Sequence, residues 1–164
     1  MRYQRGFVPD DFMVPAVLET ARVRLRQLTI ADLDIDFEAV TASADHLRAS
    51  LGPENDWPTG LTRERDLADL GWHETEFNQR TSFCYTVVSL DGTRCLGCVY
   101  IYPSLAAGFD AMCFLWVRAS AVEEGLDGHL FDAVRDWLAE IWPFRNVAFP
   151  GRTIDWTDFE AAIE

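Results

Sequence analysis

Alternation of apolar and polar residues along the chain predicts its strands. Residues 21–28 (ARVRLRQL) place Val23 and Leu25 between arginines, which is typical of a half-buried strand. Three further segments begin at residues 82, 95 and 110 (SFCYTVVS, CLGCVYIY and DAMCFLWV), and both of their alternating faces are largely apolar. We therefore expect helices or extended chain to cover both sides of this sheet. Asp91 and Gly92 indicate a hairpin turn between the first two of the three.

A period of three to four residues predicts helices between these strands. Their expected starts are near Ile30 (capped by Thr29), Ser43, Thr62 and Glu123. The third helix should run to about Gln79, with a buried stripe of Leu67, Leu70 and Phe77 that has Glu74 near its centre and His73 on its flank. The fourth should run to Ile141 and stop before Pro143. A short strand is expected near 146–149, followed by a short terminal helix.

Length and composition indicate one globular domain. The chain has 164 residues, of which 49% are hydrophobic, so it can bury a sizeable core. We expect a single domain over residues 1–164, with residues 1–20 as an extended N-terminal segment, broken by Pro9 and Pro15, and residues 150–164 as a short C-terminal tail. The first twelve residues lack the apolar core of a secretory signal, and no run approaches ~20 apolar residues. A cytoplasmic protein without membrane partners is the expectation.

The charge balance bears on the choice of partners. There are 27 acidic and 14 basic residues, giving a formal charge of −13, and every basic residue is arginine. Nonspecific nucleic-acid binding is disfavoured, because neutralising phosphates requires clustered cations. A cationic amine would be attracted, whereas an anionic cofactor would need local arginines.

The four cysteines do not indicate metal binding or redox chemistry. Cys84, Cys95, Cys98 and Cys113 all lie in apolar strand segments, and we interpret them as reduced core residues. Cys95 and Cys98 have the spacing of a ligand pair, but residues three apart in a strand point to opposite faces. No second pair completes a ligand set, so no metal site is expected.

Residues 110–133 combine an apolar strand, a short loop and an amphipathic helix. This layout is typical of a phosphate site, because unpaired N–H groups and the helix dipole face an anion at a helix N-terminus. The loop, however, carries Glu123, Glu124 and Asp127. A carboxylate 6 to 8 Å from a phosphate repels it by roughly 0.5 to 2 kcal/mol. The alternative is that these side chains point outward and serve the helix dipole.

The order of these segments resembles the GNAT superfamily of acyl-CoA-dependent N-acetyltransferases. ARVRLRQLTIADLD, CLGCVYIYP, and LWV followed by a loop and helix are similar to that family's first strand and helix, its third strand and its cofactor strand. The resemblance covers roughly residues 20–149. It implies a mixed α/β (α+β) fold, with a mostly antiparallel twisted sheet flanked by helices on both faces. The chain is shorter at its C-terminus than that family usually is.

The resemblance further implies acetyl-CoA as a cosubstrate. The main chain of Leu115, Trp116 and Val117 would then pair with the pantetheine arm. Of the family's phosphate-loop pattern, which falls on Val122, Gly125 and Asp127, only Gly125 agrees. We expect further cofactor contacts from Arg118, Gly125, Leu126 and Gly128. Arg118 and Arg152 are the cations best placed to offset the acidic loop, with surface ion pairs as the alternative for each.

Amide formation needs a proton acceptor for the amine and a proton donor for the leaving thiolate. Glu74 is the favoured base, with a partner arginine or solvent contact as the alternative reading. A histidine such as His73 titrates near neutral pH, where a general base is useful, and Tyr100 and Tyr102 are candidate proton donors. The alternative for all three is that they only pack in the core or form structural hydrogen bonds. Trp57 lies where the family keeps its acceptor-side loops and is the candidate substrate contact.

The expected function is transfer of an acetyl group from acetyl-CoA to an amine, either a small molecule or a protein N-terminal or side-chain amine. The alternative is a noncatalytic GNAT-fold module that binds a small molecule or a protein and has lost CoA binding. The two hypotheses differ in whether coenzyme A binds at the acidic loop, because the fold alone does not decide the function. The oligomeric state stays open between a monomer and a homodimer.

Overall fold

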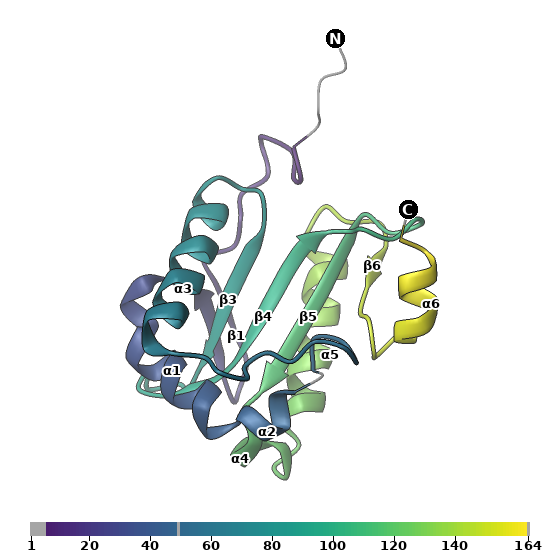
Figure 1. Ribbon diagram of the computed structural model, residues 1–164. Helices are drawn as coiled ribbons and strands as arrows, with labels where there is room; N and C mark the ends of the chain where they lie inside the picture. The colour runs from purple at the N-terminus through teal and green to yellow at the C-terminus, as the bar shows by residue number, and fades with distance from the viewer. Residues whose placement is uncertain (1–5, 49, 164) are drawn as a thin grey trace.

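The computed structural model describes residues 6–48 and 50–163, and in it six strands form one sheet in sequence order (Figure 1). Neighbouring strands are antiparallel except for the last pair, which is parallel. The strands are β1 (Val17–Glu19), β2 (Arg24–Gln27), β3 (Phe83–Val88), β4 (Cys95–Pro103), β5 (Ala111–Val117) and β6 (Val147–Ala148). The helices are η1 (Ile30–Asp32, a 3-10 turn), α1 (Leu33–Ala42), α2 (Ala44–Leu47), α3 (Arg63–Asn78), α4 (Ala119–Val122), α5 (Leu126–Glu140) and α6 (Trp156–Ala161).

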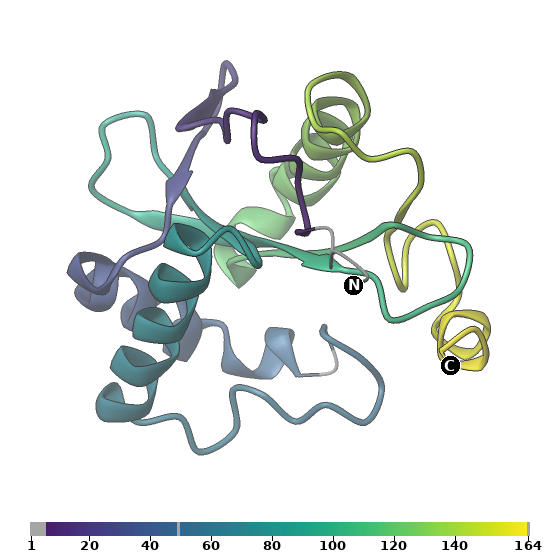
Figure 2. The same cartoon turned by 90° about the horizontal axis from the view of Figure 1, so that it is seen from above.

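Helices cover both faces of the sheet, as expected. Figure 2 shows α5 and the N-terminal segment on one side, and α1, α2 and α3 on the other. The core is correspondingly divided. One cluster joins α5 to residues such as Tyr85 and Leu115, and the second joins α1 and α3 to residues such as Cys98 and Trp116. The mixed, mostly antiparallel architecture predicted from the sequence is confirmed.

Local signals account for most helix starts. The Thr62 hydroxyl accepts a hydrogen bond from the Arg65 N–H at 3.2 Å and caps α3, as predicted. Thr29 begins a single 3-10 turn, and α1 follows it directly. The helix expected from Glu123 to Ile141 is α5, which begins at Leu126, and a short helix that was not expected, α4, precedes it. The two helices are separated because Gly125 adopts a left-handed conformation (φ 72°) and begins α5.

The N-terminal segment lies extended against the sheet. The Tyr85 hydroxyl donates to the Pro15 carbonyl at 2.7 Å, and Arg80 Nη2 donates to the carbonyls of Pro9 and Phe12 at 2.8 and 2.9 Å. Around the two prolines the described part of this segment contains no helix, and residues 1–5 of the expected segment lie outside the described residues. The segment then adds an edge strand, β1, which the sequence pattern did not predict.

A bulge in β4 corrects one expectation. The register of β4 against β3 shifts between Val87 and Val88, so Cys95 pairs with Val88 and Gly97 with Val87. The extra residue breaks the alternation, and Cys95 and Cys98 are buried on the same side of the sheet rather than on opposite sides. Gly97 also permits close strand contact, because a Cβ there would lie 2.1 Å from the Trp116 carbonyl oxygen.

No helix within the described ranges is both long and apolar enough to cross a membrane.

Candidate active site

A gap opens between β5 and β6. The two strands pair only at Ala111 with Val147 and Met112 with Ala148, although β5 continues to Val117 (Figure 1). The cavity in this gap has a volume of about 280 Å³, and its walls are His46, Ser50, Leu115, Trp116, Asp127, Pro150, Gly151, Arg152 and Trp156. The Leu115 carbonyl faces the gap, where it accepts a long hydrogen bond from Arg152 Nη2 at 3.4 Å. Main-chain groups of β5 are therefore available to a ligand that enters this gap.

The loop after β5 uses most of its own amides. The N–H groups of Ala121, Glu124 and Gly125 donate to carbonyls within the turn, at 3.0 to 3.2 Å, and the Ala119 N–H donates to Ser43 Oγ at 2.9 Å. An α-helix leaves the N–H groups of its first turn without intrahelical acceptors. At the start of α5, the donors that remain for an anion are consequently those of Leu126, Asp127 and Gly128.

The acidic loop is partly neutralised. Arg152 forms a bidentate ion pair with Asp127, with N–O distances of 2.8 and 2.9 Å, and this hydrogen bonding lowers the pKa of Asp127. Glu123 and Glu124 are exposed. One of the three carboxylates is therefore paired with an arginine, and the other two are at the surface.

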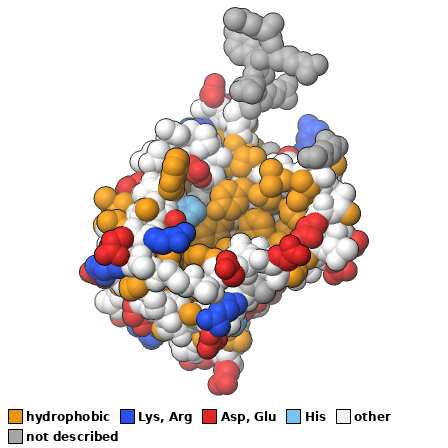
Figure 3. Space-filling model, viewed as in Figure 1, with side chains coloured by type: hydrophobic (Ala, Val, Ile, Leu, Met, Phe, Trp, Pro, Cys, Tyr) orange, Lys and Arg blue, Asp and Glu red, His pale blue; other side chains and the backbone are white. Residues whose placement is uncertain are grey.

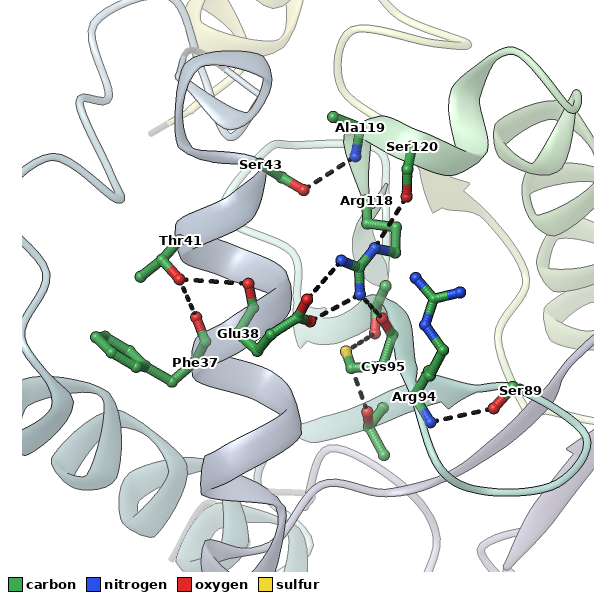
Figure 4. A network of polar contacts seen from close by, with 12 residues as sticks. Phe37, Glu38, Thr41, Ser43, Ser89, Arg94, Cys95, Arg118, Ala119 and Ser120 are labelled. Carbon is green, nitrogen blue, oxygen red and sulfur yellow. Dashed lines mark hydrogen bonds and ion pairs between the residues drawn. The ribbon is translucent and has the colours of Figure 1, made fainter.

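Arg118 holds the loop against α1 (Figure 4). Its guanidinium is almost fully buried and makes two 2.8 Å bonds to the Glu38 carboxylate, one 3.1 Å bond to the Cys95 carbonyl and one 3.1 Å bond to Ser120 Oγ. These bonds commit the side chain to protein partners. Arg118 therefore positions the start of the loop, and its guanidinium is not free for a phosphate.

A second cavity, of about 240 Å³, lies between α1, α3, the 51–57 loop and β4. An adjoining cavity of about 200 Å³ shares Tyr100 and Tyr102 with it and extends to Phe114. Figure 3 shows this face hollowed over the sheet and lined by hydrophobic side chains. The full lining of the larger cavity is Leu28, Asp36, Leu51, Asn55, Trp57, Asp66, Asp69, Leu70, His73, Tyr100 and Tyr102.

An aromatic layer connects this cavity with the gap. Trp116 lines the gap, and its Nε1 donates to the Tyr100 hydroxyl at 2.9 Å. The Trp57 ring lies 6.1 Å from the Trp116 ring, and Phe114 stacks against Trp156 at 5.9 Å, between centroids in both cases. Ligands in the two cavities would therefore approach each other across these rings.

The structure brings three of the four expected catalytic side chains to the second cavity. Burial raises the pKa of both Tyr100 and Tyr102, so the two phenols are neutral at neutral pH. Burial lowers the pKa of His73, whose imidazole is then neutral and able to accept a proton. His73 Nδ1 is buried and has no hydrogen-bond partner among the described residues.

Glu74 does not line either cavity. It is half-buried on α3, and the predicted stripe through Leu67 was wrong, because Leu67 is 43% exposed. The inward face instead carries Asp66, Leu70, His73 and Phe77. Counting only apolar residues gave the wrong face, because Asp66 is buried on α3 whereas Leu67 is exposed.

Two cavity residues, Asp36 and Asp66, were missed by the sequence reasoning. Both are buried, with exposures of 4% and 3%, and their carboxyl groups are hydrogen-bonded to each other. Burial, followed by the hydrogen bond that the Asp36 carboxyl group donates to Asp66, raises the pKa of Asp36 to about 9, and burial also raises the pKa of Asp66. The available signal was helical spacing: Asp36 shares a face with Ala39 and Val40.

No protein-family model matches the chain, and the sequence search of curated proteins found no match. Solved structures do match. The ribosomal-protein-S5-alanine acetyltransferase of Vibrio fischeri has a TM-score of 0.64 at 13% identity, covering 90% of this chain and 81% of that one. A putative ribosomal-protein-serine acetyltransferase of Vibrio cholerae has 0.67 at 12%, covering 91% and 83%.

A third match holds a ligand. RimL, a ribosomal L7/L12 α-N-protein acetyltransferase in complex with coenzyme A, has a TM-score of 0.61 at 15% identity, covering 75% of this chain and 67% of that one. At these identities the likeness concerns the arrangement of the elements. The strand order, the gap beside β5 and these matches together show that this chain has the fold of the GNAT superfamily of acetyltransferases.

Proposed function

We propose that this protein transfers an acetyl group from acetyl-CoA to an amine. The observation that carries the proposal is the gap between β5 and β6, which exposes the main chain of Leu115 beside the first turn of α5. A solved structure with the same fold contains coenzyme A. The chemistry of the gap agrees with a pantetheine arm, which carries amide groups, and with a phosphate at a helix N-terminus.

The cofactor contacts follow from the free donors and acceptors. The Leu115 carbonyl would exchange its long bond to Arg152 for a pantetheine N–H, which costs little because a 3.4 Å bond is weak. Arg152 would then contact the pyrophosphate together with the N–H groups of Leu126, Asp127 and Gly128. Gly125 supplies the left-handed residue that begins this turn.

The acceptor amine occupies the second cavity, against Trp57. His73 takes a proton from the attacking nitrogen, and the geometry favours His73 over Glu74 because only His73 lines the cavity. The nitrogen bonds to the thioester carbon, the carbon–sulfur bond breaks, and the thiolate receives a proton from Tyr102 or Tyr100. The proton on His73 then returns to the tyrosine through solvent.

Thermal unfolding with and without acetyl-CoA tests cofactor binding. A ligand at 100 times its dissociation constant adds about 2.7 kcal/mol of stability. Arg152→Gln should reduce this shift, because it removes a cation from the gap. Arg145→Gln is the matched control, since Arg145 is exposed and outside the cavity. An equal loss of shift in both variants would contradict the assigned role of Arg152.

Thiol release with a panel of amines tests turnover. His73→Asn should slow release while the shift with acetyl-CoA is retained, and Glu74→Gln should leave release unchanged. Slower release in Glu74→Gln alone would return the base assignment to Glu74.

A noncatalytic binding module is the second candidate function. It is favoured by the loop amides that are already paired and by the Arg152 side chain that lies in the gap. Absence of a thermal shift at millimolar acetyl-CoA would support this candidate over acetyl transfer.

A further inference from the structure

We propose that the cavity between α1, α3 and β4 binds a primary ammonium group, with the carboxyl pair Asp36–Asp66 as its anionic anchor. As a statement about the acceptor, this rests on the proposed function, because it names the class of amine that the site takes; the bound ammonium releases one proton to solvent before its nitrogen attacks, and His73 takes the second. Binding of the cation itself requires no acyl-CoA. It can therefore be tested separately.

The first argument is an uncompensated buried charge. Asp36 and Asp66 line the cavity and are each less than 5% exposed, yet neither forms an ion pair with any residue in the described ranges. Within those same ranges, Asp66 Oδ2 has no hydrogen-bond partner other than the Asp36 carboxyl group. A buried carboxylate is costly unless it is paired, so the remaining lone pairs of this oxygen are available to a donor from a ligand.

The second argument is the charge that the pair presents. Two carboxyl groups in contact cannot both ionise in a buried site, so they hold one proton between them and carry one negative charge. The raised pKa of Asp36 agrees with this state. A pair with a single negative charge is matched by a single positive charge.

The third argument concerns hydrogen-bond donors. A primary ammonium group has three N–H donors and no acceptor. The cavity offers two available acceptors, Asp66 Oδ2 and His73 Nδ1. A quaternary ammonium ion would donate to neither, so the cavity should select the primary cation.

The cavity walls agree with an organic cation. Trp57, Tyr100 and Tyr102 supply aromatic faces, which attract cations. The 240 Å³ volume accommodates a small head group, and the adjoining 200 Å³ space, which reaches Phe114, accommodates a short apolar chain. The expected ligand is a short primary alkylamine in its protonated form.

A metal ion is the competing occupant. Ligand atoms of Asp36, Cys95 and Cys98 lie within 4.8 Å of one another. The two thiols do not line the cavity, however, and hydrogen bonds with neighbouring thiols, together with burial, keep their pKa values high, so they are protonated. The available acceptors are Asp66 and His73, which are not in this group.

Calorimetric titration of the free protein tests the proposal with n-butylammonium chloride, n-butanol and butyltrimethylammonium chloride at constant ionic strength. Butylammonium should bind at least tenfold more tightly than either analogue. Asp66→Asn should weaken butylammonium binding at least tenfold. Glu64→Gln is the control, because it removes the same charge from an exposed position on α3. Equal affinities for the amine and the alcohol would overturn the proposal.

Two further measurements keep the proposal testable if Asp66→Asn fails to fold. Trp57→Ala changes a partly exposed loop residue, and it should weaken butylammonium binding without changing the response to butanol. In the native protein, the carboxyl ¹³C signals of Asp36 and Asp66 should shift on addition of butylammonium. Zinc binding that displaces the amine and is lost in Cys98→Ser would assign the site to a metal instead.

The two proposals fail in different ways. If acetyl-CoA does not bind but butylammonium does, the ammonium site stands and acetyl transfer is refuted. If acetyl-CoA shifts the unfolding temperature while butylammonium binds no better than butanol, only the ammonium site is refuted.

Discussion

Replacing Asp36 with asparagine should change how the stability of the protein depends on pH. The folded-state pKa of Asp36 is raised to about 9, whereas an aspartate in an unfolded chain has a pKa near 3.9. Between these values the folded protein binds one proton more than the unfolded chain. Stability from this group is therefore present at low pH and is lost as the pH rises toward 9.

The size of this pH dependence follows from the one additional proton that the folded protein binds. Each pH unit in this window costs up to about 1.4 kcal/mol of unfolding free energy, or about 2.7 kcal/mol between pH 6 and pH 8. In Asp36→Asn the amide replaces the protonated carboxyl group and does not titrate. The lowered pKa of His73 contributes in the opposite direction, but it is common to both proteins and largely cancels in the difference.

Urea unfolding, followed by tryptophan fluorescence at several pH values between 5.5 and 8, measures this difference. The native protein should lose stability relative to Asp36→Asn as the pH rises. Glu64→Gln serves as the control, because Glu64 is exposed on α3 and should leave the native slope unchanged. Parallel stability curves for the native protein and Asp36→Asn would refute the shared-proton state of the pair.

Three further substitutions test the packing around the site, each by equilibrium unfolding. Gly97→Ala should cost about 1–3 kcal/mol, because its Cβ would meet the Trp116 carbonyl oxygen at 2.1 Å; an unchanged unfolding midpoint would contradict that contact. Glu38→Ala should cost about 1–3 kcal/mol by leaving the buried Arg118 guanidinium underpaired, and it should weaken acetyl-CoA binding if Arg118 positions the loop. Tyr100→Phe should cost about 1–3 kcal/mol, because the buried indole N–H of Trp116 loses its acceptor; a neutral result would indicate another partner.

Sequence patterns were sufficient to predict most of the helices and strands and how they are arranged around the sheet. The strands at 82, 95 and 110 and the cap at Thr62 were predicted because burial periodicity and capping depend on residues close together in the chain. Apolar residues on both strand faces predicted the two covering layers. The order of elements along the chain then indicated the superfamily fold, even at identities of 12–15%.

The site was predicted less well, because its contacts join distant segments. Asp36 and Asp66 meet across two helices. The face that Asp36 shares with Ala39 and Val40 is a local sign of burial, but no local pattern identifies Asp66 as its partner. Arg118 reaches Glu38 over 80 positions, so its partner could not be identified from the loop. The bulge opposite Val87 and Val88 inserts a single residue into the strand pairing, which strand periodicity does not reveal, and it reversed the expected orientation of Cys95 relative to Cys98.

The arrangement of charge reconciles an acidic chain with an anionic cofactor. At the gap, Arg152 neutralises Asp127, and Arg22 Nη2 donates to the Glu124 carbonyl at 3.0 Å, so two cations lie beside the loop. At the second cavity no arginine within residues 6–48 and 50–163 is paired with Asp66, and negative charge is left to face the proposed acceptor. The formal charge of −13 is therefore not distributed evenly over the two sites. Negative charge that would attract an amine lies at the second cavity, while the arginines beside α5 offset the acidic loop where the phosphates are proposed to lie.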